Sequence, residues 1–407
     1  MRIPPSLAAP GLPLSVALAI APVAGVLQSK AIAPIATLAL LFCVLAHRRR
    51  HGAWPWPRGA AAWAALALFG WAALTALWAP EPPRALGTAL QIGGFVMLGA
   101  AAARAMAAED EAAKRRLVLA ATGGLVAGLA LAAADALTGN AIRAAVRGLK
   151  EVPPTLYFGL KPAASAMGLW LPVVAAAGLA RWLRGAILAL GAIVLVLLPG
   201  ESAKLAVMAG GLAGGAALLA PRWTPRLLGA ALALAILAMP AVLGPLLARG
   251  FPAEGLAPSA AHRLLIWDFV TDRIGERPLS GWGMEASRAV PGHADHPSPE
   301  SLARFRLTDP VSLMWLAPVQ LLPLHPHNGA LQLWLELGLP GALLGAALAL
   351  LLGLAASRSP RPAVATAVLA AASVTAMLSF GAWQEWWVGA ELLALAAVAA
   401  LPGRRPG

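Results

Sequence analysis

The sequence consists largely of apolar blocks of about 20 residues, and proline, glycine or charged residues end each block. A helix of roughly 20 residues spans a hydrocarbon core about 30 Å thick, so each block has the length of one membrane crossing. A single such block also occurs as a buried helix in a soluble protein, but a dozen in series leave too little polar surface to face water. Because 59% of the residues are hydrophobic and only 12% are charged, the chain is predicted to be an all-α integral membrane protein.

The blocks and their breakers predict about twelve transmembrane helices and one large polar loop. The predicted spans are 7–27, 31–46, 60–79, 85–106, 117–138, 162–182, 185–199, 203–220, 227–248, 326–354, 362–381 and 383–401. The first block has the length of a signal peptide, but proline interrupts it and a second block follows at once, so we expect it to be retained. The chain is thus predicted to divide into spans one to nine (1–248), the large loop (249–325), and spans ten to twelve with a short tail (326–407).

Positive charge gathers on one side of this predicted topology. An even number of spans puts both termini on the same side, and 17 of the 31 lysines and arginines then fall there, with three of the 18 acidic residues. Cytoplasmic loops carry such an excess. Both termini are therefore predicted to be cytoplasmic and the large loop to lie outside. Because topology accounts for the net charge of +13, no basic surface is left for a nucleic acid.

The strongest candidate for a catalytic segment is His325-Pro326-His327-Asn328. Pro326 suits the first turn of a helix, which would put His327 and Asn328 at the outer end of the tenth span. Unpaired N–H groups there favour an anion such as pyrophosphate and a neutral imidazole, so His327 is a candidate proton acceptor, with His325 and Asn328 in support. The alternative is that these residues only cap the helix at the membrane interface.

Glu336 lies deeper in the same predicted span, where a carboxylate is costly and therefore draws attention. It follows His327 by nine residues, which at ~100° per residue puts it on the opposite face of a straight helix. We therefore expect Glu336 to support the site through a hydrogen bond to another helix and not to contact the same substrate.

Three further cations lie at span ends on the outer side, where the positive-inside rule disfavours them. They are Lys161, Lys204 and Arg263. Arg263 begins the stretch 262–274, whose apolar spacing predicts a helix along the membrane surface. A single cation at such a place is more often an interfacial anchor, and Asp268 is a nearby potential ion-pair partner for Arg263.

The sequence gives little support for a metal site or a nucleotide-binding site. His293, Asp295 and His296 have spacing compatible with metal ligands, but they lie in a loop rich in proline and glycine without further organisation. The sequence has no phosphate-binding loop, dinucleotide fingerprint or Gly-x-Ser-x-Gly elbow. We expect no metal and no cofactor.

Three segments of the chain resemble the bacterial O-antigen ligase and O-antigen polymerase superfamily. They are His327-Asn328 followed by Gly338-x-x-Gly341; Arg263-Leu264-Leu265-Ile266-Trp267 with Pro278-Leu279-Ser280-Gly281-Trp282-Gly283; and Ser202-Ala203-Lys204. In order, they resemble the family's His-Asn signature at the end of a large periplasmic loop, its Arg-x-x-x-Trp segment with a Pro-leading Gly-x-Gly turn, and its Ser-x-Arg turn. The family usually has arginine where this chain has Lys204, and lysine keeps the charge but loses bidentate geometry. The same departure is expected at Lys161.

The resemblance implies a glycosyltransferase of the bacterial inner membrane whose active site faces the periplasm. Its donor would be a glycan linked to undecaprenyl diphosphate. An acceptor hydroxyl would attack the anomeric carbon, and undecaprenyl diphosphate would leave. The resemblance implies His327 as the catalytic base and Arg263, Lys204 and Lys161 as the residues that bind the diphosphate, without a metal.

The sequence leaves the identity of the acceptor open. The leading hypothesis is an O-antigen ligase that transfers the glycan to the lipid A–core. The alternatives within the superfamily are an O-antigen polymerase, which uses a lipid-linked glycan as acceptor, and a transferase to protein. A transporter or flippase for lipid-linked sugars would also explain the spans and cations, but transporters usually have paired halves, and the sequence lacks such pairing.

Overall fold

The computed structural model describes residues 9–403 of the 407-residue chain. Within this range every regular element is a helix, and no strand occurs. Arg2, Arg404 and Arg405 of the basic side, and the first two residues of the predicted first span, lie outside the described residues.

The α-helices are α1 Gly11–Leu27, α2 Ile32–His51, α3 Ala60–Leu74, α4 Pro82–Ala107, α5 Glu111–Leu137, α6 Ala141–Val146, α7 Leu160–Trp170, α8 Arg181–Leu197, α9 Glu201–Leu219, α10 Thr224–Arg249, α11 Pro258–Glu276, α12 Pro299–Arg304, α13 Pro310–Leu316, α14 Gly329–Ser357, α15 Pro362–Leu378 and α16 Glu385–Ala399. The 3-10 helices are η1 Ser29–Ala31, η2 Thr75–Leu77, η3 Pro154–Gly159, η4 Leu171–Ala176 and η5 Ala286–Arg288.

Each of the twelve predicted spans overlaps a helix, and in the described part of the chain eight helical stretches are long and apolar enough to cross a membrane. They are Ser29–His51, Ala60–Leu77, Pro82–Ala107, Glu111–Leu137, Pro154–Ala176, Glu201–Leu219, Thr224–Arg249 and Gly329–Ser357. α1 and α15 are shorter apolar helices. The chain is therefore an all-α, multi-pass membrane protein by helix length and composition, and the number twelve stays a prediction.

Two predicted boundaries are wrong for local reasons. The sequence predicts the sixth span at 162–182, but α7 changes to the 3-10 helix η4 at Leu171 and the chain leaves the helix at Ala177. Pro172 follows Leu171 directly and has no N–H to continue the hydrogen bonds of the α-helix, which favours the change to a 3-10 helix. The sequence predicts that the tenth span begins at residue 326, whereas α14 begins at Gly329, after the N-cap residue Asn328.

Small residues let the long helices approach each other closely. α10 packs along α14, α9 along α15 and α1 along α5. A Cβ atom on Gly229 of α10 would lie 3.0 Å from the Cα of Gly353 on α14, and one on Gly210 of α9 would lie 3.0 Å from the backbone oxygen of Ala367 on α15. In a membrane, such close contact replaces the hydrophobic effect as a source of helix association.

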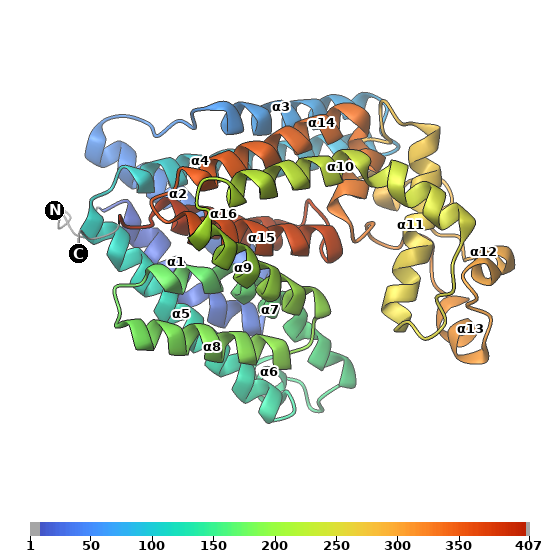
Figure 1. Cartoon of the computed structure of the whole chain (residues 1–407), viewed down its shortest axis with the longest axis horizontal. Helices are drawn as coiled ribbons and strands as arrows, with labels where there is room; N and C mark the ends of the chain where they lie inside the picture. The colour runs from blue at the N-terminus through green and yellow to red at the C-terminus, as the bar shows by residue number, and fades with distance from the viewer. Residues whose placement is uncertain (1–8, 404–407) are drawn as a thin grey trace.

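The segment between α10 and α14 forms a separate cap at one end of the bundle. Figure 1 shows α11, α12 and α13 beyond the same end of α10 and α14, while the connection between α2 and α3 lies at the opposite end. α11 confirms the helix predicted at 262–274. Its Ile266 and Val270 are buried against Leu331 and Leu335 of α14, so this helix is seated directly on the first turns of α14.

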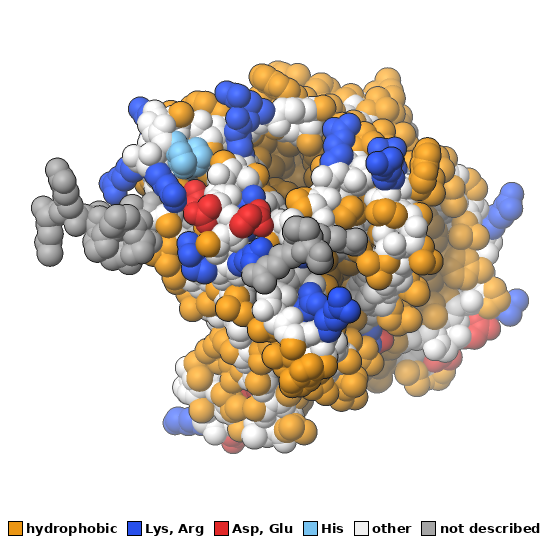
Figure 2. Space-filling view, turned by 60° about the vertical axis from the view of Figure 1, so that its left-hand side comes forward, with side chains coloured by type: hydrophobic (Ala, Val, Ile, Leu, Met, Phe, Trp, Pro, Cys, Tyr) orange, Lys and Arg blue, Asp and Glu red, His pale blue; other side chains and the backbone are white. Residues whose placement is uncertain are grey.

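The opposite end of the molecule carries a concentration of basic side chains. Figure 2 shows this end with Lys and Arg side chains spread over it, a few acids between them, and hydrophobic side chains on the flanks. Arg48, Arg49 and Arg50 are exposed here at the end of α2. This concentration of basic side chains and the cap of α11 to α13 therefore lie at different ends of the bundle.

Candidate active site

Asn328 begins α14 as its N-cap residue. Its backbone is extended, with φ −149° and ψ 110°, and its side-chain oxygen accepts a hydrogen bond from the N–H of Leu331 at 3.0 Å. This satisfies one of the N–H groups that a helix start leaves unpaired. The prediction that Pro326 lies in the first helical turn is wrong, because Pro326 and His327 precede the cap.

His327 adopts a backbone conformation that few residues other than glycine tolerate, with φ 54°. Its Nδ1 lies 2.6 Å from the backbone oxygen of Ser379, directly after α15. Since a carbonyl oxygen only accepts, Nδ1 carries the proton of the neutral ring and Nε2 keeps a free lone pair. Burial and the nearby Arg263 lower the pKa of His327, although the bond to Ser379 opposes this shift. The ring is therefore held neutral with Nε2 available as a proton acceptor.

His325 supports the conformation of His327. Its Nδ1 accepts a hydrogen bond from the backbone N–H of His327 at 3.2 Å, and the two ring centroids lie 4.2 Å apart. His325 is buried, and burial, together with His327, Arg288 and Arg263, lowers its pKa to about 3. A ring that stays neutral and accepts at Nδ1 is suited to positioning its neighbour and not to exchanging protons at neutral pH.

The structure brings Arg263 close to both histidines. It lies in the first half of α11, partly buried, and it has no hydrogen-bond or ion-pair partner among residues 9–403. Desolvation lowers the pKa of its guanidinium. Asp268, the partner considered from the sequence, pairs with Arg304 instead. A partly buried cation without a counter-charge is costly unless a ligand supplies one.

Trp267 fixes α11 against the histidine segment. Its Nε1 donates a hydrogen bond to the backbone oxygen of Pro326 at 2.8 Å. Trp267 follows Arg263 by four residues, which puts both side chains on one face of the helix. The Arg-x-x-x-Trp spacing therefore has a structural reason. The tryptophan attaches one face of α11 to the histidine segment, and the arginine lies on that same face.

Lys204 and Lys161 both lie beside the turn before α9. The Nζ of Lys204 lies 2.8 Å from a carboxylate oxygen of Glu201, which is exposed. The ammonium of Lys161 lies 4.6 Å from the ring centre of Phe158, and Gly200 lies against the backbone of Lys161. Both cations thus have local partners, but these partners, Glu201 and Phe158, are exposed to solvent.

Ser379 links this turn to His327. Its hydroxyl lies 3.1 Å from that of Ser202, while its backbone oxygen accepts from His327. The Ser202 to Lys204 turn and His327 are therefore joined through a single residue. Sequence reasoning missed Ser379, because a serine at the end of an apolar span has no distinguishing pattern.

Glu336 is fully buried and accepts four hydrogen bonds. The donors are the hydroxyl of Ser287, the indole N–H of Trp383 at 2.6 Å, the backbone N–H of Glu285 at 2.8 Å and the amide of Gln332 at 3.2 Å. The predicted hydrogen bond between Glu336 and another helix is confirmed, since Ser287 lies in η5. These bonds tie η5 and the α15–α16 connection to α14, and a supporting role of Glu336 in the site stays a prediction.

α14 is broken at Gly338, which has φ 62° and ψ −162°. The turn 278–283 fills the break: Trp282 N–H donates to Leu335 O, Gly283 N–H to Glu336 O, and Leu339 N–H to Pro278 O, all at 2.8–2.9 Å. A Cβ on Gly338 or Gly281 would collide with the backbone of the other segment. The span predicted at 326–354 is therefore not one continuous helix, since the turn inserts at Gly338.

Arg288 is a further cation that sequence reasoning missed. It is exposed, contributes to the low pKa of His325, and lines a cavity of about 40 Å³ together with His325 and Gln384. Nothing in its local sequence sets it apart from the other arginines of the loop. Only the fold shows that η5 brings it to the histidines.

The potential metal ligands of the loop do not come together. His296 Nδ1 lies 2.9 Å from the backbone oxygen of Val319. A different group of potential metal ligands does come together in the described chain. It consists of His47, His51 and Glu109 at the basic end, whose ligand atoms lie within 4.8 Å of one another. There Glu109 pairs with Arg50 at 3.1 Å, so its carboxylate already has a cation.

Residues 186–346 match the family model described as O-Antigen ligase. Three curated relatives carry the name "Putative polysaccharide ligase". Those of Rickettsia conorii, Rickettsia bellii and Rickettsia prowazekii are 32%, 32% and 34% identical over 141, 165 and 138 residues, which cover 34%, 39% and 32% of this chain and 31%, 37% and 30% of theirs. The chain thus spans about a third of the length of these relatives.

No solved structure matches the chain significantly. The stretch matched by the family model runs from α8 into α14 and includes Lys204, Arg263 and His327. Over residues 186–346 the chain therefore carries the pattern of the O-antigen ligase family, and the resemblance indicated by its motifs is confirmed.

Proposed function

We propose that this protein transfers a glycan from undecaprenyl diphosphate to the lipid A–core. An acceptor hydroxyl oxygen attacks the anomeric carbon of the donor, and the bond from that carbon to the phosphate oxygen breaks. The hydroxyl proton passes to His327 Nε2, and undecaprenyl diphosphate leaves with the bonding electron pair. The family match over residues 186–346 supports this class of reaction.

His327 is the proposed base because its Nδ1 is already engaged in a hydrogen bond, which leaves Nε2 free to accept a proton. The bond from Nδ1 to Ser379 O at 2.6 Å fixes both the tautomer and the ring orientation. A base that is oriented by a third group in this way needs no rearrangement before it accepts a proton. Because burial lowers the pKa of His327 below its ordinary value, the neutral ring is favoured near pH 7.

The proposal rests mainly on the environment of Arg263. It combines partial burial, proximity to His325 and His327, and the lack of a partner in the described chain. A diphosphate supplies the missing counter-charge, and a guanidinium binds its oxygens in bidentate fashion. Lys204 and Lys161 add charge from the other side of Ser379, so that protein cations stabilise the leaving group in place of a divalent ion.

The site is proposed to face the periplasm, with twelve spans and both chain ends in the cytoplasm. The basic end in Figure 2 and the cap of α11 to α13 at the other end support this orientation. In a Cys43→Ser background, Met314→Cys in the cap should react with a membrane-impermeant maleimide in intact cells, and Trp56→Cys should not. Both residues are more than half exposed, so the reverse pattern would overturn the orientation.

The test of the function is turnover by the purified full chain in detergent. Release of undecaprenyl diphosphate together with glycan-extended lipid A–core is the expected result, and a transporter would give neither without two compartments. If the acceptor is instead a second lipid-linked glycan, the product stays on the lipid carrier and the protein is a polymerase. In a deletion strain, accumulation of long lipid-linked chains indicates a ligase, whereas single units attached to the core indicate a polymerase.

A further inference from the structure

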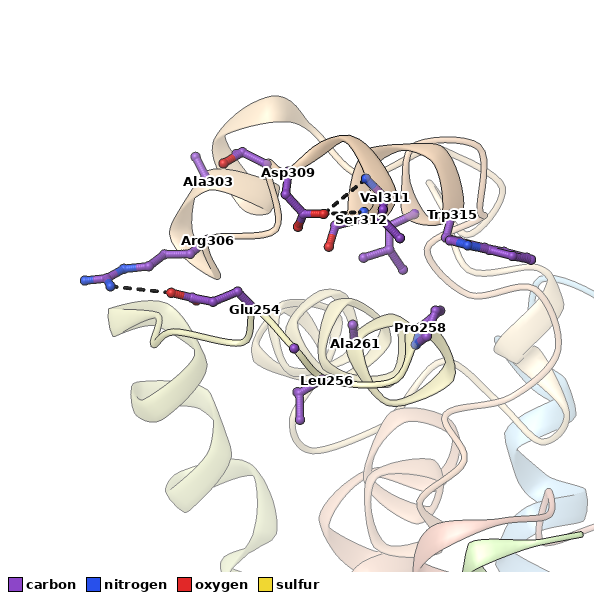
Figure 3. A pocket seen from close by; sticks show the side chains of 13 residues that line it. Glu254, Leu256, Pro258, Ala261, Ala303, Arg306, Asp309, Val311, Ser312 and Trp315 are labelled. Atoms are coloured by element: carbon purple, nitrogen blue, oxygen red, sulfur yellow. Dashed lines mark hydrogen bonds and ion pairs between the residues drawn. The ribbon is translucent and has the colours of Figure 1, made fainter.

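A cavity of about 670 Å³ lies in the cap, between the first turns of α11 and the helices α12 and α13 (Figure 3). This volume is in the range of sites for small organic ligands. Its wall includes Pro258 and Ala261 of α11 and Asp309, Ser312 and Trp315 around α13. The cavity does not include His325, His327 or Arg263, so it is distinct from the proposed catalytic site.

Polar and aromatic groups occupy opposite ends of the cavity. Figure 3 shows the Arg306–Glu254 pair at one end and the indole of Trp315 at the other, with Asp309 between them. The side chains of Arg306 and Glu254 lie 3.6 Å apart and are at least half exposed, and Trp315 is 56% exposed. The indole of Trp315 is therefore accessible to a ligand in the cavity.

The polar wall is built into the fold. One oxygen of Asp309 accepts hydrogen bonds from the N–H groups of Val311 and Ser312 at 3.1 and 3.0 Å, so the carboxylate both caps α13 and is fixed in the cavity wall. Acids fixed in this way accept further hydrogen bonds from a ligand without losing side-chain freedom.

The lining favours a ligand that is rich in hydroxyl groups and not strongly anionic. Two carboxylates against one guanidinium disfavour a phosphate-rich ligand, and three charged side chains disfavour a lipid tail. A sugar ring offers hydroxyl donors to Asp309 and Glu254 and an apolar C–H face to the indole of Trp315. Aromatic side chains combine such an apolar face with a small loss of conformational entropy.

The cavity and Arg263 lie on opposite faces of the same helix. Arg263 follows Ala261 by two residues, a rotation of ~200° around α11, whereas Trp267 shares the face of Arg263. A ligand in the cavity is therefore separated from the proposed diphosphate position by roughly the 10 Å thickness of one helix. A glycan of several sugar units that reacts beside His327 has more distant units within reach of the cavity.

We propose that this cavity is a glycan subsite that binds sugar units remote from the bond that is formed. The inference rests on the proposed function and adds to it a second point of contact for one of the two glycans. The glycan is that of the donor or that of the acceptor, which share the same hydroxyl chemistry. A subsite that binds these units equally in the ground state and the transition state lowers KM without changing kcat.

The test compares Trp315→Ala with Met314→Ala in the full chain in nanodiscs. Met314 lies on the same short helix and is 64% exposed, but it does not line the cavity. Two probes are titrated by calorimetry: donor glycan freed from its diphosphate, and core oligosaccharide freed from lipid A. Neither can react, so binding is measured independently of catalysis. Loss of one aromatic contact should weaken binding of one probe about 3- to 10-fold in Trp315→Ala and leave Met314→Ala unchanged.

The outcomes separate the two glycan sources and also separate this proposal from the proposed reaction. The probe that loses affinity identifies the source, and KM for the corresponding substrate should rise in Trp315→Ala while kcat stays near the wild-type value. The subsite is overturned if neither probe binds, or if wild type and Trp315→Ala bind each probe with equal affinity. A chain that binds a probe in the cavity but never forms product would keep the subsite and refute the transferase.

Discussion

His327 Nδ1 lies 2.6 Å from the backbone oxygen of Ser379, and this bond joins the entrance of α14 to the end of α15. It fixes which nitrogen of His327 is free. Because Ser379 also meets Ser202, the base and the cationic turn before α9 are positioned by the same residue. The pH dependence of the reaction should follow from this arrangement.

The acid limb of the rate profile should lie below the ordinary histidine pKa of about 6.5. Burial and Arg263 lower the pKa of His327, and only the neutral ring accepts a proton, so activity persists below pH 6.5 and is lost as the pH falls through the lowered pKa. Arg263→Ala removes a cation that disfavours imidazolium, so its acid limb should move to higher pH. An unchanged limb in Arg263→Ala, measured from kcat/KM against pH, would show that the two side chains are not coupled.

Arg263→Ala should weaken binding of undecaprenyl diphosphate more than Lys204→Ala or Lys161→Ala does. Arg263 is the one guanidinium among the three and has no partner in the described chain, whereas Lys204 is already paired with Glu201. Arg263→Lys should restore only part of the affinity, because it keeps the charge but loses the fork.

The alternative for Arg263 is a structural role in the cap, and limited proteolysis distinguishes the two. A structural arginine predicts a protease-sensitive cap with product affinity barely changed. Unchanged product affinity in both variants, measured by calorimetry in detergent, would remove Arg263 from the donor site.

Gly338→Ala should destabilise the protein strongly. A methyl group there meets the backbone of Leu279, and φ 62° with ψ −162° is a conformation that costs other residues about 1–3 kcal/mol even without a collision. Gly123→Ala on α5 is the matched control, because Gly123 is helical and has nothing within 4 Å of its would-be Cβ. We expect a lower melting temperature in detergent for Gly338→Ala alone, and equal melting temperatures would contradict the insertion of the 278–283 turn.

Activity should survive chelation. The charge on the leaving diphosphate is balanced by Arg263, Lys204 and Lys161 in the proposed mechanism, so EDTA should leave the initial rate within about twofold. Loss of activity that Mg²⁺ or Mn²⁺ restores would show that these cations are insufficient.

Much of the fold follows from the apolar blocks, because a helix of membrane length leaves a strong pattern. The helix at 262–274 and the hydrogen-bonded role of Glu336 were also predictable, the first from spacing and the second from the cost of a buried acid. The start of α14 was not, because Pro326 fits a first helical turn as well as the extended segment that precedes one.

The remaining parts of the site depend on contacts between distant segments. Ser379 and Arg288 have ordinary sequence surroundings, and only the fold brings them to His325 and His327. The break at Gly338 likewise requires the turn 278–283, some 55 residues earlier, to supply the backbone partners. Local patterns contain no information on such pairings.

The most direct test of the central claim is single-turnover transfer by a His327→Asn variant. Asparagine tolerates the left-handed conformation of residue 327 better than most residues, so the variant should fold and bind donor normally while lacking the base. His296→Ala is the control, since His296 has a similar imidazole-to-carbonyl contact outside the site, at 2.9 Å from Val319 O. His325→Ala should reduce the rate much less than His327→Asn. We predict a ~10²–10⁴-fold lower rate for His327→Asn, and a rate equal to that of wild type would contradict the account.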